Sequence, residues 1–221
     1  LTPGLAIIGE PTTMRVIEGH KGCFEYSTHF HGLAGHGSAP DRGVNAVEYA
    51  ARYVTRLLDL KDELRARAPA SSRFDPPWTT INTGGLTGGV AHNVIPSAAR
   101  VDWEMRPVQN SDADFVKQNL RDYCANVLLP AMQAVDPDAR IDTEMIAEVT
   151  GLEPADANEA RDIVLELTGG ATEAGLFQHY GLSAVVCGPG SIEQAHKADE
   201  YVSLDQLSQC LDMLDRLGDK L

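Results

Sequence analysis

The sequence lacks the long apolar run that a membrane-spanning helix needs, and it has few basic residues for its acidic ones. No uninterrupted apolar stretch approaches the ~20 residues that span a bilayer. The 221 residues include 18 Lys and Arg against 32 Asp and Glu, which gives a formal net charge of −14. Because this charge repels phosphate backbones and anionic lipids on average, we expect neither a nucleic-acid partner nor a membrane partner.

Cysteine pairs at metal-binding or redox spacing are also missing. The four cysteines lie far apart, with no Cys-x-x-Cys and no Cys/His cluster at zinc-finger spacing. Reduced thiols in a cytoplasmic protein fit this pattern best, although an even number of cysteines also permits pairing. The sequence contains no nucleophile elbow, no Walker loop and no dinucleotide fingerprint.

The start of the chain is unusual. It begins at Leu1 without methionine and enters an apolar strand almost at once. A basic segment followed by an apolar stretch, as in a signal peptide, does not occur there. We therefore expect the sequence to be part of a longer polypeptide.

Apolar patterns at both ends of the chain predict parts of an α/β domain. A strand over 2–10 ends at Gly9-Glu10-Pro11-Thr12, so a carboxylate lies at its carboxyl end, where open α/β sheets bind ligands. A second apolar strand over 183–187 is broken by Gly188-Pro189-Gly190-Ser191. Helices are predicted over 157–167, from Glu173 and from Ser203, the last with an inner stripe of Leu204, Leu207, Leu211 and Leu214.

The middle of the chain predicts an α+β module. The alternating segment 24–30 is a half-buried strand, and an amphipathic helix follows over 44–60. Further strands are predicted over 79–83 and 99–106, and a helix begins at Ser111. This order fits an antiparallel sheet with helices on one face.

The remaining segments set the predicted domain boundaries. Segments 61–78 and 83–89 are interpreted as a loop and a flexible glycine turn. The outer parts look like one α/β domain into which the middle module is inserted. We predict that residues 1–21 and 139–221 form the outer domain, including a strand over 141–149, and that residues 22–138 form the module.

Two residues are candidate metal ligands. Glu10 follows the first strand, and His196 follows the glycine-rich break after the second apolar strand and precedes Asp199-Glu200. A carboxylate and an imidazole that converge on one sheet edge suit a divalent metal such as zinc. The alternative is that Glu10 caps a turn and His196 is an ordinary loop histidine.

Other polar residues are candidates for binding or catalysis. His36 lies in a glycine-rich turn, where its imidazole can donate to a developing oxyanion or serve only the turn. The Asn93 amide can polarise a carbonyl, although Asn is also common in turns. Arg106 can pair with a substrate carboxylate or form a surface salt bridge. Thr172 and Glu173 begin a helix that can bind an anionic or polar group at its amino end, or are simply its cap.

Several short motifs occur in a fixed order along essentially the whole chain. They are Gly9-Glu10-Pro11-Thr12, His20-Lys21-Gly22, Gly35-His36-Gly37-Ser38-Ala39-Pro40 with Arg42-Gly43-Val44-Asn45-Ala46, Asn93-Val94-Ile95-Pro96, Arg106-Pro107, Thr172-Glu173-Ala174, and Gly188-Pro189-Gly190-Ser191 through His196. This order resembles the dinuclear-zinc amidohydrolase family of acetylornithine deacetylase, succinyl-diaminopimelate desuccinylase and carboxypeptidase G. The segment 188–201 looks most like acetylornithine deacetylase.

The resemblance implies an α/β zinc-hydrolase catalytic domain interrupted by an α+β lid or dimerisation domain. It implies a cytoplasmic homodimer formed through the lid. Glu10 would be the terminal carboxylate ligand of one zinc and His196 the imidazole ligand of the other, with cobalt as a substitute metal. His36 and Asn93 of the lid would stabilise the tetrahedral oxyanion, with His36 reaching a neighbouring subunit's site.

The resemblance also implies a substrate and a reaction. Arg106 would hold the carboxylate of a small N-acyl amino acid, and Thr172 and Glu173 would line the pocket. A zinc-bound water would attack the amide while a carboxylate passes its proton to the leaving amine. With N-acetylornithine, the products would be acetate and ornithine, a step of arginine biosynthesis.

The sequence also departs from the family pattern. The family carries a His-x-Asp, a bridging Asp and a Glu-Glu pair ahead of the Gly-Glu-Pro-Thr motif, and here nothing precedes Leu1 and no Glu-Glu occurs. Two ligands cannot fill even one tetrahedral zinc site. We therefore expect the C-terminal part of such an enzyme, inactive and unable to hold two zincs alone. Another N-acyl amino acid or dipeptide hydrolase, or a non-catalytic dimerisation or binding module, remains the alternative.

Overall fold

The computed structural model describes residues 5–17, 19–154, 182–195 and 197–219, and the chain divides into two compact units. Unit 1 comprises Leu1–Gly22 and Val149–Leu221, and unit 2 comprises Cys23–Glu148. Unit 1 contains parallel strands, whereas unit 2 contains an antiparallel sheet with helices. The predicted combination of α/β and α+β parts is confirmed.

Unit 2 is built on a four-stranded sheet. Its strands, in order across the sheet, are β4 (Thr80–Gly88), β6 (Ala98–Arg106), β2 (Cys23–His31) and β7 (Arg140–Val149). The alternation predicted for β2 is strict, because Phe24, Tyr26, Thr28 and Phe30 are buried and the residues between them are half-exposed. One face of the sheet is therefore apolar and the other face is polar.

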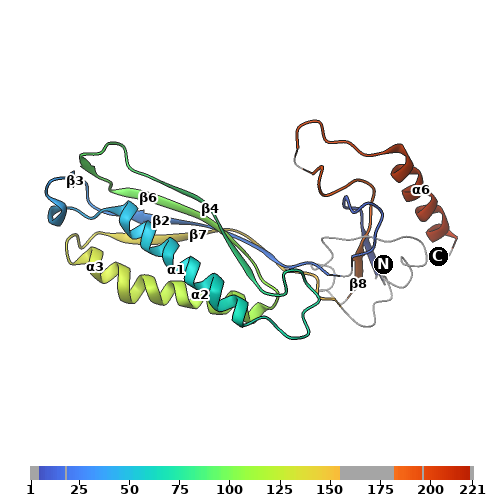
Figure 1. The fold of residues 1–221 in the computed structure, drawn as a ribbon, viewed down its shortest axis with the longest axis horizontal. Helices are drawn as coiled ribbons and strands as arrows, with labels where there is room; N and C mark the ends of the chain where they lie inside the picture. Colours follow the sequence, from blue (N-terminus) through green and yellow to red (C-terminus); the bar gives the residue numbers. More distant parts are fainter. Residues whose placement is uncertain (1–4, 18, 155–181, 196, 220–221) are drawn as a thin grey trace. The chain divides into compact units, whose positions relative to one another are not determined.

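Helices cover the apolar face of this sheet (Figure 1). They are α1 (Ala46–Ala66), α2 (Asn110–Tyr123), a π-helical turn over Cys124–Leu128, and α3 (Leu129–Gln133). The Asn45 side chain caps α1 by accepting hydrogen bonds from two backbone amides of its first turn. Tyr53, Leu57, Leu60 and Leu64 recur at helical spacing and are almost fully buried against the sheet.

Two segments of unit 2 are more regular than the sequence predicted. The helix α1 continues to Ala66, whereas a loop was predicted from residue 61, because Leu60 and Leu64 extend its buried stripe. The segment 83–89 was interpreted as a flexible turn, but most of it belongs to β4. A bulge between Thr83 and Gly85 keeps the strand paired with β6, and glycine accommodates such bulges readily.

The predicted C-terminal boundary of the inserted module, at residue 138, was wrong. The strand β7 lies beside β2 in the sheet of unit 2, and this unit ends at Glu148. Side-chain contacts join the two strands, because the hydroxyls of Thr28 and Thr143 lie 3.1 Å apart and Tyr26 donates to Glu148. The alternation of β7 alone does not reveal which sheet it joins.

Unit 1 is held by two parallel strands, β1 (Leu5–Ile8) and β8 (Ser183–Val186). Side chains of β8 alternate between two apolar clusters, as the pleat of a strand requires. One cluster joins Val185 and Cys187 to Met14 and Met213, and the other joins Ala184 and Val186 to Leu152. Both faces of this ladder are therefore apolar, as is typical of parallel sheets.

The C-terminal helix α6 (Leu204–Gly218) packs through a different face from the one predicted. Met213, with Cys210 and Leu217, contacts the cluster around Val185. The predicted inner stripe is instead exposed in the described part of the chain, with 84% of Leu204 and 63% of Leu211 accessible. The helix carries two apolar stripes at helical spacing, and periodicity alone does not distinguish them.

Two expectations drawn from composition concern the helices and the cysteines. None of the helices in the described ranges is both long and apolar enough to cross a bilayer. All four cysteines are free thiols. Burial raises the pKa of Cys124 to about 11, so this thiol stays protonated and weakly nucleophilic at neutral pH.

A buried carboxylate links the start of α2 to neighbouring elements by hydrogen bonds. Asp112 is fully buried and accepts hydrogen bonds from Arg67 Nε at 2.9 Å, Thr79 Oγ1 at 2.6 Å and Gln109 Nε2 at 3.1 Å. These partners lie at the end of α1, just before β4 and just before α2. The carboxylate thus joins three elements of unit 2.

Replacing Asp112 by Ala should destabilise unit 2 by about 2 kcal/mol, because it leaves buried donors without an acceptor. Denaturant unfolding followed by tryptophan fluorescence measures this change, since Trp78 and Trp103 both lie in unit 2. Asp114→Ala, at an exposed position of the same helix turn, is the matched control. Equal stability of the two variants would contradict the role assigned to Asp112.

Candidate functional site

The carboxyl ends of β1 and β8 bring together two of the motifs singled out in the sequence. The Cys187 amide donates to the Ile8 carbonyl at 2.7 Å, which extends the parallel ladder. Beyond it, Thr12 Oγ1 donates to the Gly188 carbonyl at 3.2 Å and lies 3.1 Å from the Gly188 amide. The segments 9–13 and 188–191 therefore form one edge, as expected for parallel strands that end together.

The chain reverses at this edge through two left-handed residues. Thr13 and Met14 have φ values of 54° and 58°, a conformation that costs a residue with a side chain roughly 1–2 kcal/mol. The Thr13 amide donates to Gly190 at 2.6 Å, the Met14 amide donates to Gly188 at 3.1 Å, and the Met14 side chain is buried. Such strain persists where surrounding contacts enforce it, and it is common at functional sites.

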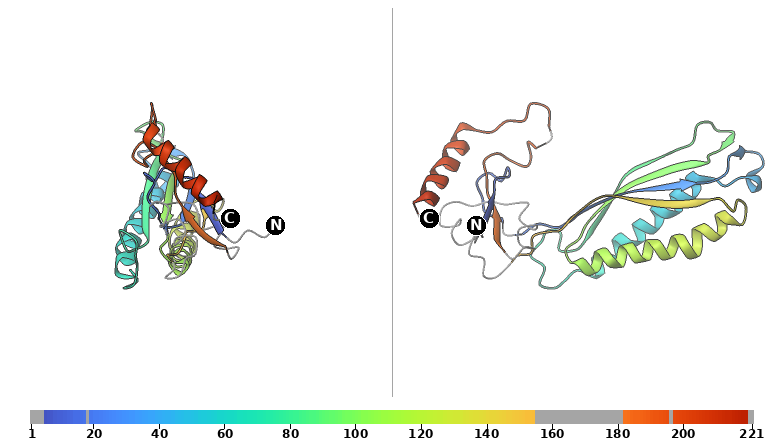
Figure 2. Two further views of the ribbon diagram at one scale, coloured as in Figure 1. Left: turned by 90° about the vertical axis from the view of Figure 1, so that its right-hand side faces the viewer. Right: turned by 180° about the vertical axis from the view of Figure 1, so that it is seen from behind.

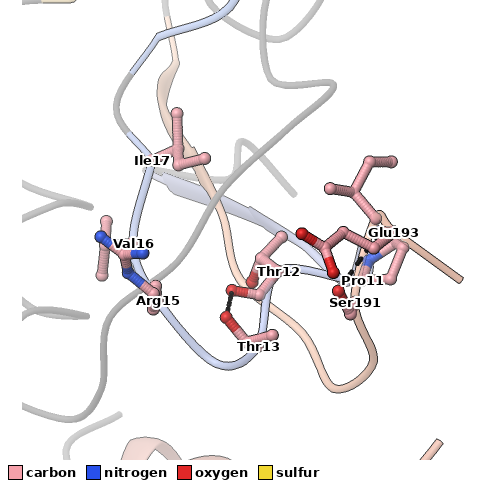
Figure 3. A pocket seen from close by; sticks show the side chains of 9 residues that line it. Pro11, Thr12, Thr13, Arg15, Val16, Ile17, Ser191 and Glu193 are labelled. Carbon is pink, nitrogen blue, oxygen red and sulfur yellow. Dashed lines mark hydrogen bonds between the residues drawn. The ribbon is translucent and has the colours of Figure 1, made fainter.

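A cleft of about 650 Å³ lies against this edge (Figure 3). Its lining residues come from the segment after β1 and from the loop after β8, and they are Pro11, Thr12, Thr13, Arg15, Val16, Ile17, Ser191, Ile192 and Glu193. The cleft presents threonine and serine hydroxyls, the Glu193 carboxylate and the Arg15 guanidinium. Since Pro11, Val16, Ile17 and Ile192 add apolar surface, a small molecule with both apolar and polar groups suits such a lining.

The candidate metal ligands are only partly within the described residues. Glu10 lies at the carboxyl end of β1, half-buried beside Gly188. His196 lies outside the described residues, as do the candidate pocket residues Thr172 and Glu173. Since zinc sites use three or four protein ligands, the donors described at this edge do not make up a zinc site by themselves.

His36 and Asn93 lie together at one end of unit 2. His36 belongs to β3 (Gly35–His36), which pairs with β5 (Val94–Ile95) in a small two-stranded sheet. The Gly37 amide donates to the Asn93 carbonyl at 2.7 Å. We call β3, β5 and Asn93 the tip of unit 2; Figures 1 and 2 show this end of the sheet. Both side chains are exposed, so both are accessible to an incoming group.

The hydrogen bonds of His36 determine which ring nitrogen carries its proton. The Ser38 backbone amide donates to His36 Nδ1 at 3.2 Å, and Ser38 Oγ lies 2.7 Å from the same nitrogen. A backbone amide can only donate, so Nδ1 is the acceptor and the neutral ring carries its proton on Nε2. The Nε2–H is thus available to donate to an oxyanion.

Arg106 lies at the opposite end of unit 2 from the tip. It ends β6, whereas Ala98 at the start of β6 lies opposite His31, close to the tip. At about 3.4 Å per residue, the two ends of this strand are about 27 Å apart. The structure therefore does not bring Arg106 to His36 and Asn93 within one chain.

The guanidinium of Arg106 is already paired with a carboxylate. Its Nε and Nη2 donate to the two oxygens of Glu104 at 3.2 and 3.0 Å. This bidentate bond raises the pKa of Arg106 above its ordinary value, so the residue stays charged. A substrate carboxylate would have to compete with Glu104 or share the guanidinium with it.

Glu104 also belongs to a small group of potential metal ligands. In the part of the chain that the structure describes, Cys23, Glu25 and Glu104 offer ligand atoms within 4.8 Å of one another. Burial raises the pKa of the Cys23 thiol, and the two carboxylates raise it further while Arg106 opposes them. A protonated thiol is a poor metal ligand, and Arg106 already supplies a cation there. We therefore assign no metal site to this group.

Sequence reasoning missed two residues that act on the candidates. Ser38 sets the tautomer of His36, and its position two residues later in the same turn was the available signal. Glu104 accepts the hydrogen bonds of the Arg106 guanidinium. Its position two residues earlier on the same strand face was the available signal.

Comparison with known proteins identifies unit 2. A family model described as "Peptidase dimerisation domain" matches residues 18–132. The chain belongs to this family. The match covers the tip, α1 and most of the sheet that define unit 2.

Curated relatives of this dimerisation-domain chain extend the similarity to unit 1. It is 35% identical to the acetylornithine deacetylase of Myxococcus xanthus over 217 residues, which are 96% of this chain and 56% of the relative. It is 31% identical to the acetylornithine deacetylase of Pasteurella multocida over 225 residues, with 98% and 57% covered. The chain thus spans little more than half the length of these relatives.

Solved structures resemble the fold of the chain. A tripeptidase from Staphylococcus aureus matches with a TM-score of 0.68 and 18% identity, covering 97% of this chain and 56% of that one. The aminopeptidase PepT from Bacillus cereus matches with a TM-score of 0.69 and 17% identity, with the same coverage. At these identities the similarity concerns the fold alone.

Replacing Gly188 by Ala should loosen the edge at the candidate site. A Cβ there would lie 2.6 Å from the Glu10 carbonyl oxygen and 2.8 Å from the Gly9 carbonyl carbon, both of them backbone atoms. Because such overpacking costs about 1–3 kcal/mol, the amides of β1 and β8 should lose about tenfold or more of their hydrogen-exchange protection. Gly9→Ala is the matched control, since a Cβ at Gly9 meets nothing within 4 Å. Unchanged protection in Gly188→Ala would contradict the close approach.

Proposed function

We propose that this chain is the C-terminal part of a metal-dependent amide hydrolase of the acetylornithine deacetylase type. Unit 1 would belong to the catalytic domain, and unit 2 would be the lid and dimerisation domain. The observation that carries the proposal is the similarity to acetylornithine deacetylases over both units, at 31–35% identity. In the complete protein, the reaction would release acetate and ornithine from N-acetylornithine in the cytoplasm.

The proposal gives each candidate residue a task. Glu10 and His196 would each bind one of two zinc ions, and the ligands missing from this chain would come from the rest of the complete protein. Thr172 and Glu173 would line the substrate pocket. His36 would donate its Nε2–H to the oxyanion that forms at the amide carbonyl, and the Asn93 amide would donate beside it. Arg106 would bind the substrate carboxylate.

The distance along β6 supports a division of these tasks between two subunits. The tip and Arg106 lie about 27 Å apart at opposite ends of the strand, more than a small N-acyl amino acid can span. If His36 and Arg106 act on one substrate molecule, they therefore come from different chains. We propose a homodimer in which the tip of one lid completes the site of the other subunit.

The free edges of the unit 2 sheet favour one strand as the dimer contact. The edge strand β7 carries charges at Arg140, Asp142, Glu144 and Glu148, which discourage pairing with another sheet. The other edge strand, β4, has no charged residue over Thr80–Gly88, and Leu86 is 45% exposed on it. We propose that two lids associate along β4.

The hydrolase proposal is tested with the complete protein, including the segment that its relatives carry in addition. Acetate release from N-acetylornithine is compared with turnover of succinylated amino acids and dipeptides. Preference for either of the other classes would replace the deacetylase assignment. Lack of turnover with all three classes, in a metal-loaded protein, would favour a non-catalytic dimerisation module.

Replacing His36 by Ala in the complete protein should lower kcat about a hundredfold or more, because it removes an oxyanion donor. Bound metal, measured by atomic absorption, should not change, since His36 lies in unit 2. His92→Ala removes an exposed histidine beside Asn93 and is the matched control. Equal kcat for both variants would refute the role of His36.

Replacing Leu86 by Lys should weaken the dimer by placing a charge on the β4 edge. Sedimentation velocity should show a shift toward monomer at micromolar concentration. Ile146→Lys places the same charge on β7 at a residue of similar exposure, 54%, and should leave the dimer intact. Dissociation by Ile146→Lys alone would move the contact to β7.

A further inference from the structure

Unit 2 contains a cavity between its sheet and α2 that the proposed hydrolase function does not use. It has a volume of about 230 Å³ and is lined by Tyr26, Tyr53, Trp103, Lys117, Leu120, Arg121, Thr143 and Met145. These residues come from three strands and both long helices of the unit. The residues that line the cavity therefore all belong to regular elements rather than to loops.

Aromatic rings form the inner wall of the cavity. Tyr26 and Trp103 stack with centroids 4.5 Å apart, and the Tyr53 ring meets Trp103 edge-on at 6.4 Å. The polar atoms of these rings are already bonded within the protein. Trp103 Nε1 donates to Thr28 Oγ1 at 3.1 Å, Thr28 also bonds to the Tyr53 hydroxyl, and Tyr26 donates to Glu148. The wall thus presents mainly ring carbons, which suits a flat apolar group.

Two of the residues that line the cavity are cationic, Lys117 and Arg121. Lys117 Nζ lies 3.2 Å from Glu148 and is largely neutralised by it. Arg121 is exposed, and its hydrogen bond within the described residues goes to the neutral amide of Gln118 at 3.3 Å. Across the described ranges, no carboxylate forms an ion pair with Arg121. In a chain with a net charge of −14, this leaves a local positive charge beside the aromatic wall.

We propose that this cavity binds a small aromatic carboxylate, with its ring against Tyr26, Trp103 and Met145 and its carboxylate on Arg121. An apolar cavity of about 150 Å³ is sufficient for benzene, so 230 Å³ has room for one ring and its acid group. The guanidinium can bind the carboxylate through two parallel hydrogen bonds. The cavity lies wholly within unit 2, so the proposal does not rest on the hydrolase activity.

The proposal is tested by titrating the chain with phenylacetate at millimolar concentration. Trp103 fluorescence, read in a Trp78→Phe background, should change saturably, because Trp103 forms part of the wall. Phenylacetamide has the same ring without the charge and should bind at least about tenfold more weakly, since charge-assisted hydrogen bonds are the stronger ones.

Two variants distinguish this site from binding elsewhere. Arg121→Gln should raise the Kd for phenylacetate about tenfold, whereas Arg52→Gln, which removes an exposed charge from α1, should not. Met145→Phe fills the cavity from an exposed position of β7 and should abolish binding without unfolding the unit. Absence of saturable binding, equal affinity for phenylacetamide, or unchanged affinity in both Arg121→Gln and Met145→Phe would overturn the proposal.

Discussion

The parallel ladder between β1 and β8 is the interaction on which unit 1 depends. Leu5–Ile8 pairs with Ser183–Val186, so the ladder joins segments that lie on either side of unit 2 in the sequence. Both apolar clusters of the unit are built on its two faces. The ladder also aligns the ends of the two strands, and it thereby places the turn after Glu10 against Gly188.

Unit 2 carries two groups of polar side chains at opposite ends of one sheet. Its tip presents His36 and Asn93, with the imidazole proton directed to Nε2 by Ser38. Its other end presents Arg106, held by Glu104. Buried aromatic and leucine side chains between sheet and helices keep these ends apart. The sheet thus holds a different kind of polar side chain at each of its two ends.

Local pattern was sufficient where a single apolar pattern marks the buried side of an element. The alternation of Phe24, Tyr26 and Phe30 predicted β2, and the two strand ends near Glu10 and Gly188 predicted a shared edge. Pattern failed where the residues alone do not identify the partner against which an element packs. It placed β7 in the wrong unit, and it did not choose between the two stripes of α6. A salt bridge was one of the two alternatives predicted for Arg106, and the structure identifies Glu104 as the partner.

The neighbouring positions of β2 and β7 have a consequence for how such proteins arise. The first and last strands of unit 2 lie side by side, and Tyr26 near one end bonds to Glu148 near the other. A domain whose two chain ends lie side by side can be inserted into a surface loop of another protein without distorting that loop. Unit 2 therefore meets the geometric requirement for exchange as one piece, because the chain enters and leaves it through neighbouring strands.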